Sequence, residues 1–163
     1  MNNILYSPWR IDYILSEKQD KCVFCFPKAD DDKHFVVYRN ENCYVILNHY
    51  PYNNGHIMVI PNRHVSNLNQ LSEKENCELF STVRLATKVL KVVYKCEGLN
   101  IGINEGKAAG AGIESHLHVH LLPRWVGDSN FMTTIAGTRV IPDSYENTFS
   151  QLKEQFDNET SQN

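Results

Sequence analysis

A strict alternation of histidine and apolar residues from 116 to 122 constrains the fold more than any other stretch of the chain. It reads H-L-H-V-H-L-L, and the side chains of an extended strand repeat with a period of two. The spacing predicts a strand on which His116, His118 and His120 share one face. The apolar residues between them share the other face, toward a core. Because a buried imidazole needs hydrogen-bond partners, three on one face indicate a functional site rather than packing.

Short apolar runs separated by turn residues predict four more strands, at residues 34–38, 42–48, 55–60 and 99–104. One long helix is expected from Ser72 to Cys96, since Ser72 and Glu75 have the spacing of a capping box. Its apolar face is predicted to contain Leu79, Val83, Ala86, Leu90 and Val93. With an expected C-terminal helix, these elements indicate an α+β fold with an antiparallel sheet of about five strands.

The 163 residues and the mass of 18.8 kDa fit one domain. We expect that domain to span residues 1–156, followed by a polar tail at 157–163 that frays. A hydrophobic content of 42% excludes a disordered chain. The formal net charge of -3 gives no broad basic face, so nucleic acid is not expected as a partner.

Membrane and export signals are not found in the sequence. No apolar run approaches the roughly 18 residues of a membrane span, so we expect no membrane partner. The first residues lack the basic start and apolar stretch of a signal peptide. The chain has five cysteines, whereas an exported protein normally pairs its cysteines. These features predict a cytoplasmic protein.

Two chemistries fit three clustered imidazoles. The rings together could bind a catalytic metal, as zinc enzymes do with three histidines and an open position. Alternatively, one ring acts as a nucleophile, because neutral imidazole is well populated near pH 7. It would attack phosphorus and form a covalent phosphoramidate. The spacing alone leaves both interpretations open.

A glycine-rich loop leads directly into the histidine cluster. Five of the eight glycines lie between positions 98 and 112, and residues 105–115 read E-G-K-A-A-G-A-G-I-E-S. A backbone without side-chain bulk approaches a phosphate closely and offers it N–H donors. A flexible surface loop is the alternative interpretation.

Preceded by this loop, the pattern H-φ-H-φ-H-φ-φ, with φ apolar, resembles the signature of the histidine triad (HIT) family of nucleotidyl hydrolases and transferases. The similarity extends to residues 5–14, to N-H-Y-P-Y-N-N-G-H at 48–56 and to P-R-W-x-G-D-x-N-F-M at 123–132. The chain is most similar to the bacterial branch labelled diadenosine tetraphosphate phosphorylase or HIT hydrolase. The resemblance implies cleavage of a dinucleoside polyphosphate, a nucleoside phosphoramidate or a phosphate ester at the α-phosphate. It also implies a homodimer whose sheets join across the interface.

The resemblance assigns roles to individual residues. It implies that His118 is the nucleophile and that His120 contacts the phosphate or the scissile bridging oxygen. The residues expected to bind substrate are Asn48 at the ribose, Ile46 and Met58 at the base, and Asn104, Gly110 and Gly112 at the phosphates. Some relatives carry a hydroxyl residue where Gly112 stands, so one hydrogen bond to phosphate is missing here. Hydrolysis and phosphorolysis therefore both stay open.

The pair Cys22 and Cys25 forms a C-x-x-C motif, which is half of a zinc site, a redox pair or chance. A closed zinc site needs two more ligands, and His64 and His116 are the candidates. Many bacterial HIT relatives resemble this pattern, which implies structural zinc and no catalytic cofactor. A metal there would anchor the start of the histidine strand and leave His118 and His120 for chemistry.

Two other functions remain open at this point. In the first, the chain is a non-catalytic nucleotide-binding, zinc-stabilised interaction module. In the second, it is a metallohydrolase whose metal is held by His116, His118 and His120. The ligand set distinguishes them, since a structural site requires Cys22 and a metallohydrolase site requires His118.

Overall fold

The computed structural model describes residues 22–128 and 141–161. The similarity at residues 5–14 and the end of the run at 123–132 lie outside this part of the chain. Within it, no helix combines the length and apolar character needed to cross a membrane.

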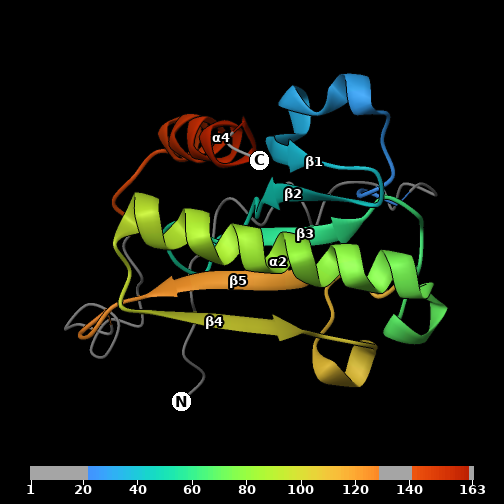
Figure 1. The fold of residues 1–163 in the computed structure, drawn as a ribbon. Helices are drawn as coiled ribbons and strands as arrows, with labels where there is room; N and C mark the ends of the chain where they lie inside the picture. Colours follow the sequence, from blue (N-terminus) through green and yellow to red (C-terminus); the bar gives the residue numbers. More distant parts are fainter. Residues whose placement is uncertain (1–21, 129–140, 162–163) are drawn as a thin grey trace, which may run out of the picture.

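Five strands form one antiparallel sheet in the order β1-β2-β3-β5-β4 (Figure 1). The strands are β1 (Val36–Arg39), β2 (Cys43–Leu47), β3 (Ile57–Pro61), β4 (Gly98–Ile103) and β5 (Val119–Arg124). Short 3-10 turns lie in the connections at η1 (Lys28–Asp30), η2 (Asp32–His34), η3 (Leu68–Gln70) and η4 (Lys107–Ala109). The predicted α+β class and the five-stranded sheet are confirmed.

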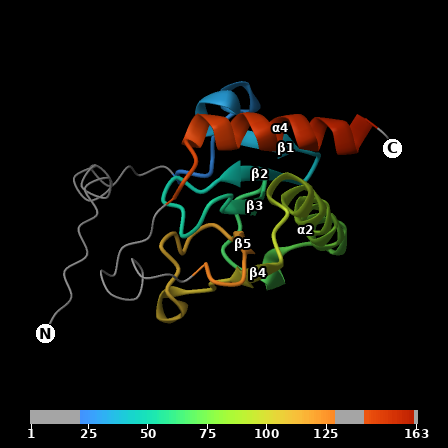
Figure 2. The ribbon, with the colours of Figure 1, turned by 90° about the vertical axis from the view of Figure 1, so that its left-hand side faces the viewer.

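Two helices, α2 (Glu73–Tyr94) and α4 (Tyr145–Ser161), pack against the sheet, and Figure 2 shows α2 on one side of it. Ser72 caps α2 in the predicted capping box with Glu75. The helix ends earlier than expected because Lys95 adopts a left-handed conformation (φ 46°). The C-terminal helix reaches Ser161, so most of the segment predicted as a fraying tail is helical.

The main core lies between the sheet and the two helices. Alternate residues of the central strands face it, and α2 contributes the apolar face predicted from its spacing. The fully buried members from the helices are Leu79, Val83, Ala86, Val89, Leu90, Leu152 and Phe156. Val93, the last residue of the predicted face, is partly buried against the same core.

The alternation around β5 is confirmed, although the strand begins later than predicted. Leu117, Val119 and Leu121 all lie in the main core, so the histidines between them lie on the opposite side. The strand does not stop at Pro123, which pairs with Leu99 of β4. Because β3 begins at Ile57, opposite Leu121, its pairing with β5 does not reach Pro123, and on that side no strand needs the N–H that proline lacks.

A second apolar cluster covers the sheet face that carries the histidines. Its buried members are Phe24, Val36, Tyr44, Ile46, Met58 and Ile60. Across the strands, Ile46 lies opposite Met58, Met58 opposite His120, and His120 opposite Gly102. The register therefore places His120 beside an apolar floor.

Candidate functional site

His118 and His120 form a pair of adjacent rings on this face. Their ring centroids lie 4.8 Å apart at an angle of 80°. His118 is only 5% exposed, and its ring also contacts Phe24 at 5.4 Å. The two predicted catalytic histidines are therefore brought together, with an aromatic wall beside the first.

A backbone carbonyl determines which nitrogen of His118 carries the proton. The Nδ1 atom lies 2.8 Å from the carbonyl oxygen of His116. A carbonyl oxygen only accepts, so Nδ1 must donate. In the neutral ring the lone pair is then on Nε2, which is the atom able to act as a nucleophile.

His120 is set in the opposite tautomer through His56. The backbone N–H of Tyr52 donates to His56 Nδ1 at 3.1 Å, so the proton of neutral His56 is on Nε2. That Nε2 lies 2.9 Å from His120 Nδ1 and donates to it. Neutral His120 therefore carries its own proton on Nε2. The neighbouring rings thus offer a lone pair at His118 and an N–H donor at His120.

Burial keeps His56 and His120 neutral. Loss of solvation, followed by the charge of His120, lowers the pKa of His56 to about 3. Loss of solvation, followed by the charge of His118, lowers the pKa of His120 to about 4. Both rings are therefore uncharged near pH 7, where the tautomers described above apply.

Sequence reasoning gave no role to His56 or Phe24. A period-two pattern was nevertheless present in the predicted strand at 55–60, since it places His56 on the same face as Met58. For Phe24 no such signal existed, because its position depends on how the C-x-x-C segment folds back over the sheet.

The predicted base and ribose residues meet beside the histidine pair. Ile46 and Met58 are buried neighbours in the second apolar cluster. The Asn48 amide oxygen accepts from the backbone N–H of Tyr50 at 2.9 Å. Its amide nitrogen lies 3.2 Å from His56 Nε2, but both atoms are donors in the tautomer above. The amide nitrogen therefore keeps its donors for a ligand.

The glycine-rich loop begins where β4 ends. Half-buried Asn104 follows that strand, and Gly110 has a positive φ of 84° that favours glycine. Gly112 has no positive φ, and an added Cβ would meet nothing within 4 Å. The next residue, Ile113, packs against the second apolar cluster and so ties the loop to the site face.

Cys22, Cys25, His64 and His116 also come together, with their ligand atoms within 4.8 Å of one another. Cys22 Sγ lies 3.4 Å from His116 Nδ1, and Cys25 Sγ lies 3.2 Å from His64 Nδ1. The Nε2 atom of His116 donates to the Pro61 carbonyl at 2.9 Å, which leaves Nδ1 as an acceptor facing the sulfurs. Two thiols and two imidazoles fit a closed tetrahedral metal site.

The same geometry contradicts the metallohydrolase alternative. His116 directs Nδ1 at the cysteines, and the Nδ1 of His118 is occupied by a carbonyl. In the described ranges 22–128 and 141–161, the only group of metal-ligating side chains found is the cysteine and histidine cluster. The three histidines of the 116–120 motif therefore do not converge on one ion.

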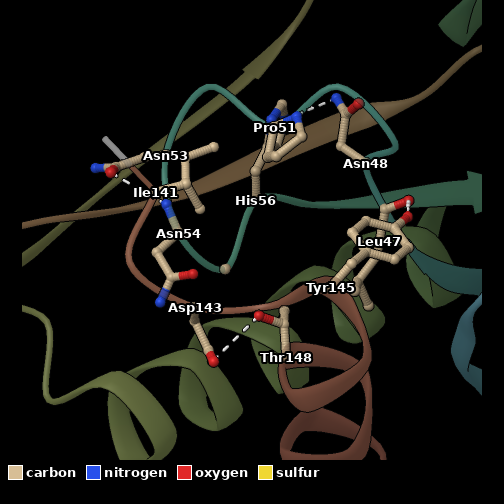
Figure 3. Close-up of a pocket in the computed structure, with 11 residues that line it drawn as sticks. Leu47, Asn48, Pro51, Asn53, Asn54, His56, Ile141, Asp143, Tyr145 and Thr148 are labelled. Carbon is tan, nitrogen blue, oxygen red and sulfur yellow. Dashed lines mark hydrogen bonds between the residues drawn. The ribbon is translucent and has the colours of Figure 1, made fainter. Parts of the chain in front are cut away.

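A small cavity lies behind Asn48 and His56, where the 47–56 segment meets the start of α4 (Figure 3). Tyr145 donates its hydroxyl to the Leu47 carbonyl at 3.1 Å across this junction. The volume of about 140 Å³ is below the roughly 300 Å³ of small ligand pockets. The cavity is therefore too small to hold a nucleotide.

The HIT domain family matches residues 30–126. The chain is 40% identical over 148 residues to a Mycobacterium tuberculosis protein named AP-4-A phosphorylase, covering 85% of this chain and 76% of that protein. It is 38% identical over 93 residues to the asymmetrical bis(5'-nucleosyl)-tetraphosphatase of Schizosaccharomyces pombe, covering 57% and 50%.

Solved structures agree with these matches. A zinc-bound histidine triad family protein from Mycobacterium smegmatis superimposes with a TM-score of 0.71 at 28% identity, over 87% of this chain and 97% of the other. Together with the match over residues 30–126, this shows that the chain belongs to the HIT family.

The depressed pKa of His56 makes stability depend on pH. In the unfolded chain this ring takes up a proton below about pH 6.5, whereas the folded ring does so only near pH 3. The unfolded state therefore binds more protons in this window, and stability falls as the pH is lowered. For His56 alone we expect a loss of about 1–2 kcal/mol between pH 7 and pH 5.

Urea unfolding of the wild type and of His56→Gln at both pH values measures this contribution. The difference between the two proteins cancels contributions from metal and from groups that do not contact His56. The wild type should lose more stability than the variant on acidification. Equal losses would show that His56 is not held neutral.

Proposed function

We propose that the chain cleaves dinucleoside polyphosphates at the α-phosphate through a covalent nucleotidyl intermediate on His118. Membership of the HIT family and the 40% identity to a phosphorylase make it a HIT-type nucleotide-processing enzyme. The observation that supports the mechanism is the pair of opposite tautomers, with a lone pair on His118 Nε2 and a proton on His120 Nε2.

The reaction follows from these two atoms. His118 Nε2 attacks the α-phosphorus, and the bond from phosphorus to the bridging oxygen breaks. The electron pair leaves with the departing nucleotide, whose oxygen receives a hydrogen bond from His120 Nε2. Water or inorganic phosphate then attacks the phosphoramidate, which releases a nucleoside mono- or diphosphate and restores His118.

The surrounding residues bind the transferred nucleotide. Ile46, Met58 and the Phe24 ring form an apolar surface for its base. Asn48 donates to the ribose hydroxyls. The phosphates receive hydrogen bonds from Asn104 and from the backbone of the loop that contains Gly110 and Gly112. Nucleoside phosphoramidates and phosphate esters would place the same base, ribose and α-phosphate in this site.

The cysteine and histidine cluster is proposed to hold structural zinc through Cys22, Cys25, His64 and His116. The ligand set supports this, and a solved HIT neighbour is described as zinc-bound. When bound, zinc would cross-link the C-x-x-C segment to the residue before the catalytic strand. None of the five cysteines is paired in a disulfide, which agrees with a reducing compartment, and we propose the cytoplasm.

We also propose a homodimer in which β4 of two copies pair. In the described part of the chain, β4 has a strand partner on one side only, β5. An edge strand presents unpaired backbone groups, and Ile101 on this edge is 48% exposed. Light scattering should give a solution mass of twice 18.8 kDa. A monomer mass at micromolar concentration would contradict the paired edge.

Replacing the nucleophile tests the mechanism. His118→Asn should lower turnover of diadenosine tetraphosphate by about 10³-fold or more, because the covalent step is lost. AMP binding by calorimetry should persist, since base and ribose contact other residues. Exposed His34→Asn is the matched control and should keep full activity.

The products of the wild type distinguish the possible reactions. ATP with ADP, formed only when inorganic phosphate is present, indicates phosphorolysis, and ATP with AMP indicates hydrolysis. AMP binding without turnover would support the interaction module. Wild-type rates in His118→Asn would rule out covalent catalysis at this residue.

Removal of one cysteine tests the metal. Cys25→Ala should lose the bound zinc and lower the free energy of unfolding by several kcal/mol, because a closed structural site contributes directly to folding. Metal analysis and urea unfolding measure both effects. Cys77→Ala, at an exposed thiol on α2, serves as the control. An unchanged zinc content and an unchanged free energy of unfolding in Cys25→Ala would contradict a zinc site at this cluster.

A further inference from the structure

Gly102 leaves an open position beside His120. The two residues lie directly opposite each other in the antiparallel pair β4 and β5, so side chains at both positions point to the same face of the sheet. Gly102 has no positive φ, and an added Cβ would meet nothing within 4 Å in the described part of the chain. Neither backbone conformation nor packing within this chain therefore requires a glycine here.

A glycine inside a strand costs conformational entropy, so its presence needs another reason. Such glycines commonly mark a bulge, or a place where a ligand or another backbone approaches closely. The register of β4 against β5 runs without a shift from Gly98 to Ile103, so no bulge lies at Gly102. No other segment among residues 22–128 and 141–161 approaches its Cβ position. Within this chain, a bound ligand is the remaining reason.

The rest of this face of β4 is small and polar. Because side chains alternate along a strand, Gly102 shares its face with Gly98 and Asn100. The side-chain oxygen of Asn100 accepts from Arg124 Nη1 at 2.6 Å, which leaves the amide N–H groups as its donors for a ligand. Arg124 is itself held by an ion pair with Asp128. We call the surface formed by Gly98, Asn100 and Gly102 the β4 face.

The two sides of His120 differ, because β5 lies between β3 and β4 (Figure 1). On the β3 side, Met58 is buried in the second apolar cluster, and the ring of His56 is bonded to His120 Nδ1. On the β4 side, Gly102 leaves the surface open. A charged group that contacts His120 Nε2 therefore finds room over β4 and not over the apolar floor.

We propose that the β4 face is the subsite for the polyphosphate chain of the leaving nucleotide. The inference rests on the proposed function, in which the base lies over Ile46 and Met58 and His120 contacts the departing oxygen. The substrate would then cross the sheet from β2 and β3, past the histidines of β5, to β4. Phosphate oxygens accept hydrogen bonds and approach a glycine backbone closely, which suits this surface. Pairing of two β4 edges would extend the sheet and leave the face uncovered.

Two variants of the β4 face test the subsite with diadenosine tetraphosphate in the presence of inorganic phosphate. Gly102→Val fills the open space, and we expect kcat/KM to fall about tenfold or more. Valine is favoured in strands, so this variant should fold. Asn100→Asp keeps an acceptor for Arg124 but adds a negative charge beside the polyphosphate, so kcat/KM should fall as well. AMP lacks the leaving chain, so its dissociation constant from calorimetry should stay unchanged in both variants.

Matched controls alter other surfaces. Ile101→Val changes the opposite face of the same strand, and Asn158→Asp adds the same charge at an exposed position of α4. Both controls should keep the wild-type kcat/KM. Circular dichroism confirms that each variant is folded.

Each outcome supports or overturns the subsite. Lower kcat/KM in both Gly102→Val and Asn100→Asp, with unchanged AMP binding, supports it. An unchanged kcat/KM in either variant overturns it, and weaker AMP binding overturns it by assigning the residue to the transferred nucleotide. A changed solution mass of Gly102→Val in light scattering would assign the glycine to a contact between copies instead. If the wild type does not cleave diadenosine tetraphosphate, the proposed function itself falls.

Discussion

The carbonyl oxygen of His116 determines the chemistry of the site, because it holds the Nδ1 proton of His118 at 2.8 Å. His116 makes contacts through its carbonyl oxygen and through both ring nitrogens. Its Nε2 donates to Pro61 at the end of β3, and its Nδ1 faces Cys22 and Cys25. One residue thus connects the sheet, the cysteine cluster and the His118 ring, and a shift of its backbone would change which nitrogen of His118 is available.

The second requirement of the site is burial, which keeps its imidazole rings neutral. His56 and His120 stay uncharged because the sheet and the 48–56 segment remove them from water. The chain of hydrogen bonds through these two rings begins at the backbone N–H of Tyr52. A backbone N–H can only donate, so it fixes the direction of the bonds that follow. Backbone groups therefore set opposite tautomers on two adjacent rings. A network built only from side chains would allow the protons to redistribute.

Much of this arrangement could be predicted from the sequence. Period-two spacing correctly placed Leu117 and Val119 on the core side of the sheet, and helical spacing correctly predicted the buried face of α2. Both patterns depend on local backbone geometry. The same spacing placed His56 on the face of Met58, but its contact with His120 arises from register, and the position of Phe24 arises from chain folding over the sheet, so neither contact could be predicted. The boundaries at Lys95 and Pro123 also differed, because a non-glycine helix end and a proline inside a strand depend on tertiary context.

The junction between Tyr145 and Leu47 joins the C-terminal helix to the segment that carries Asn48. Both α4 and the two cysteines lie outside residues 30–126, the span that the HIT family matches. The histidine motif is therefore braced from two sides by parts of the chain that lie outside this span. A change in either flanking part would therefore shift the segment that carries Asn48, or the start of the histidine strand, while the motif itself stays intact.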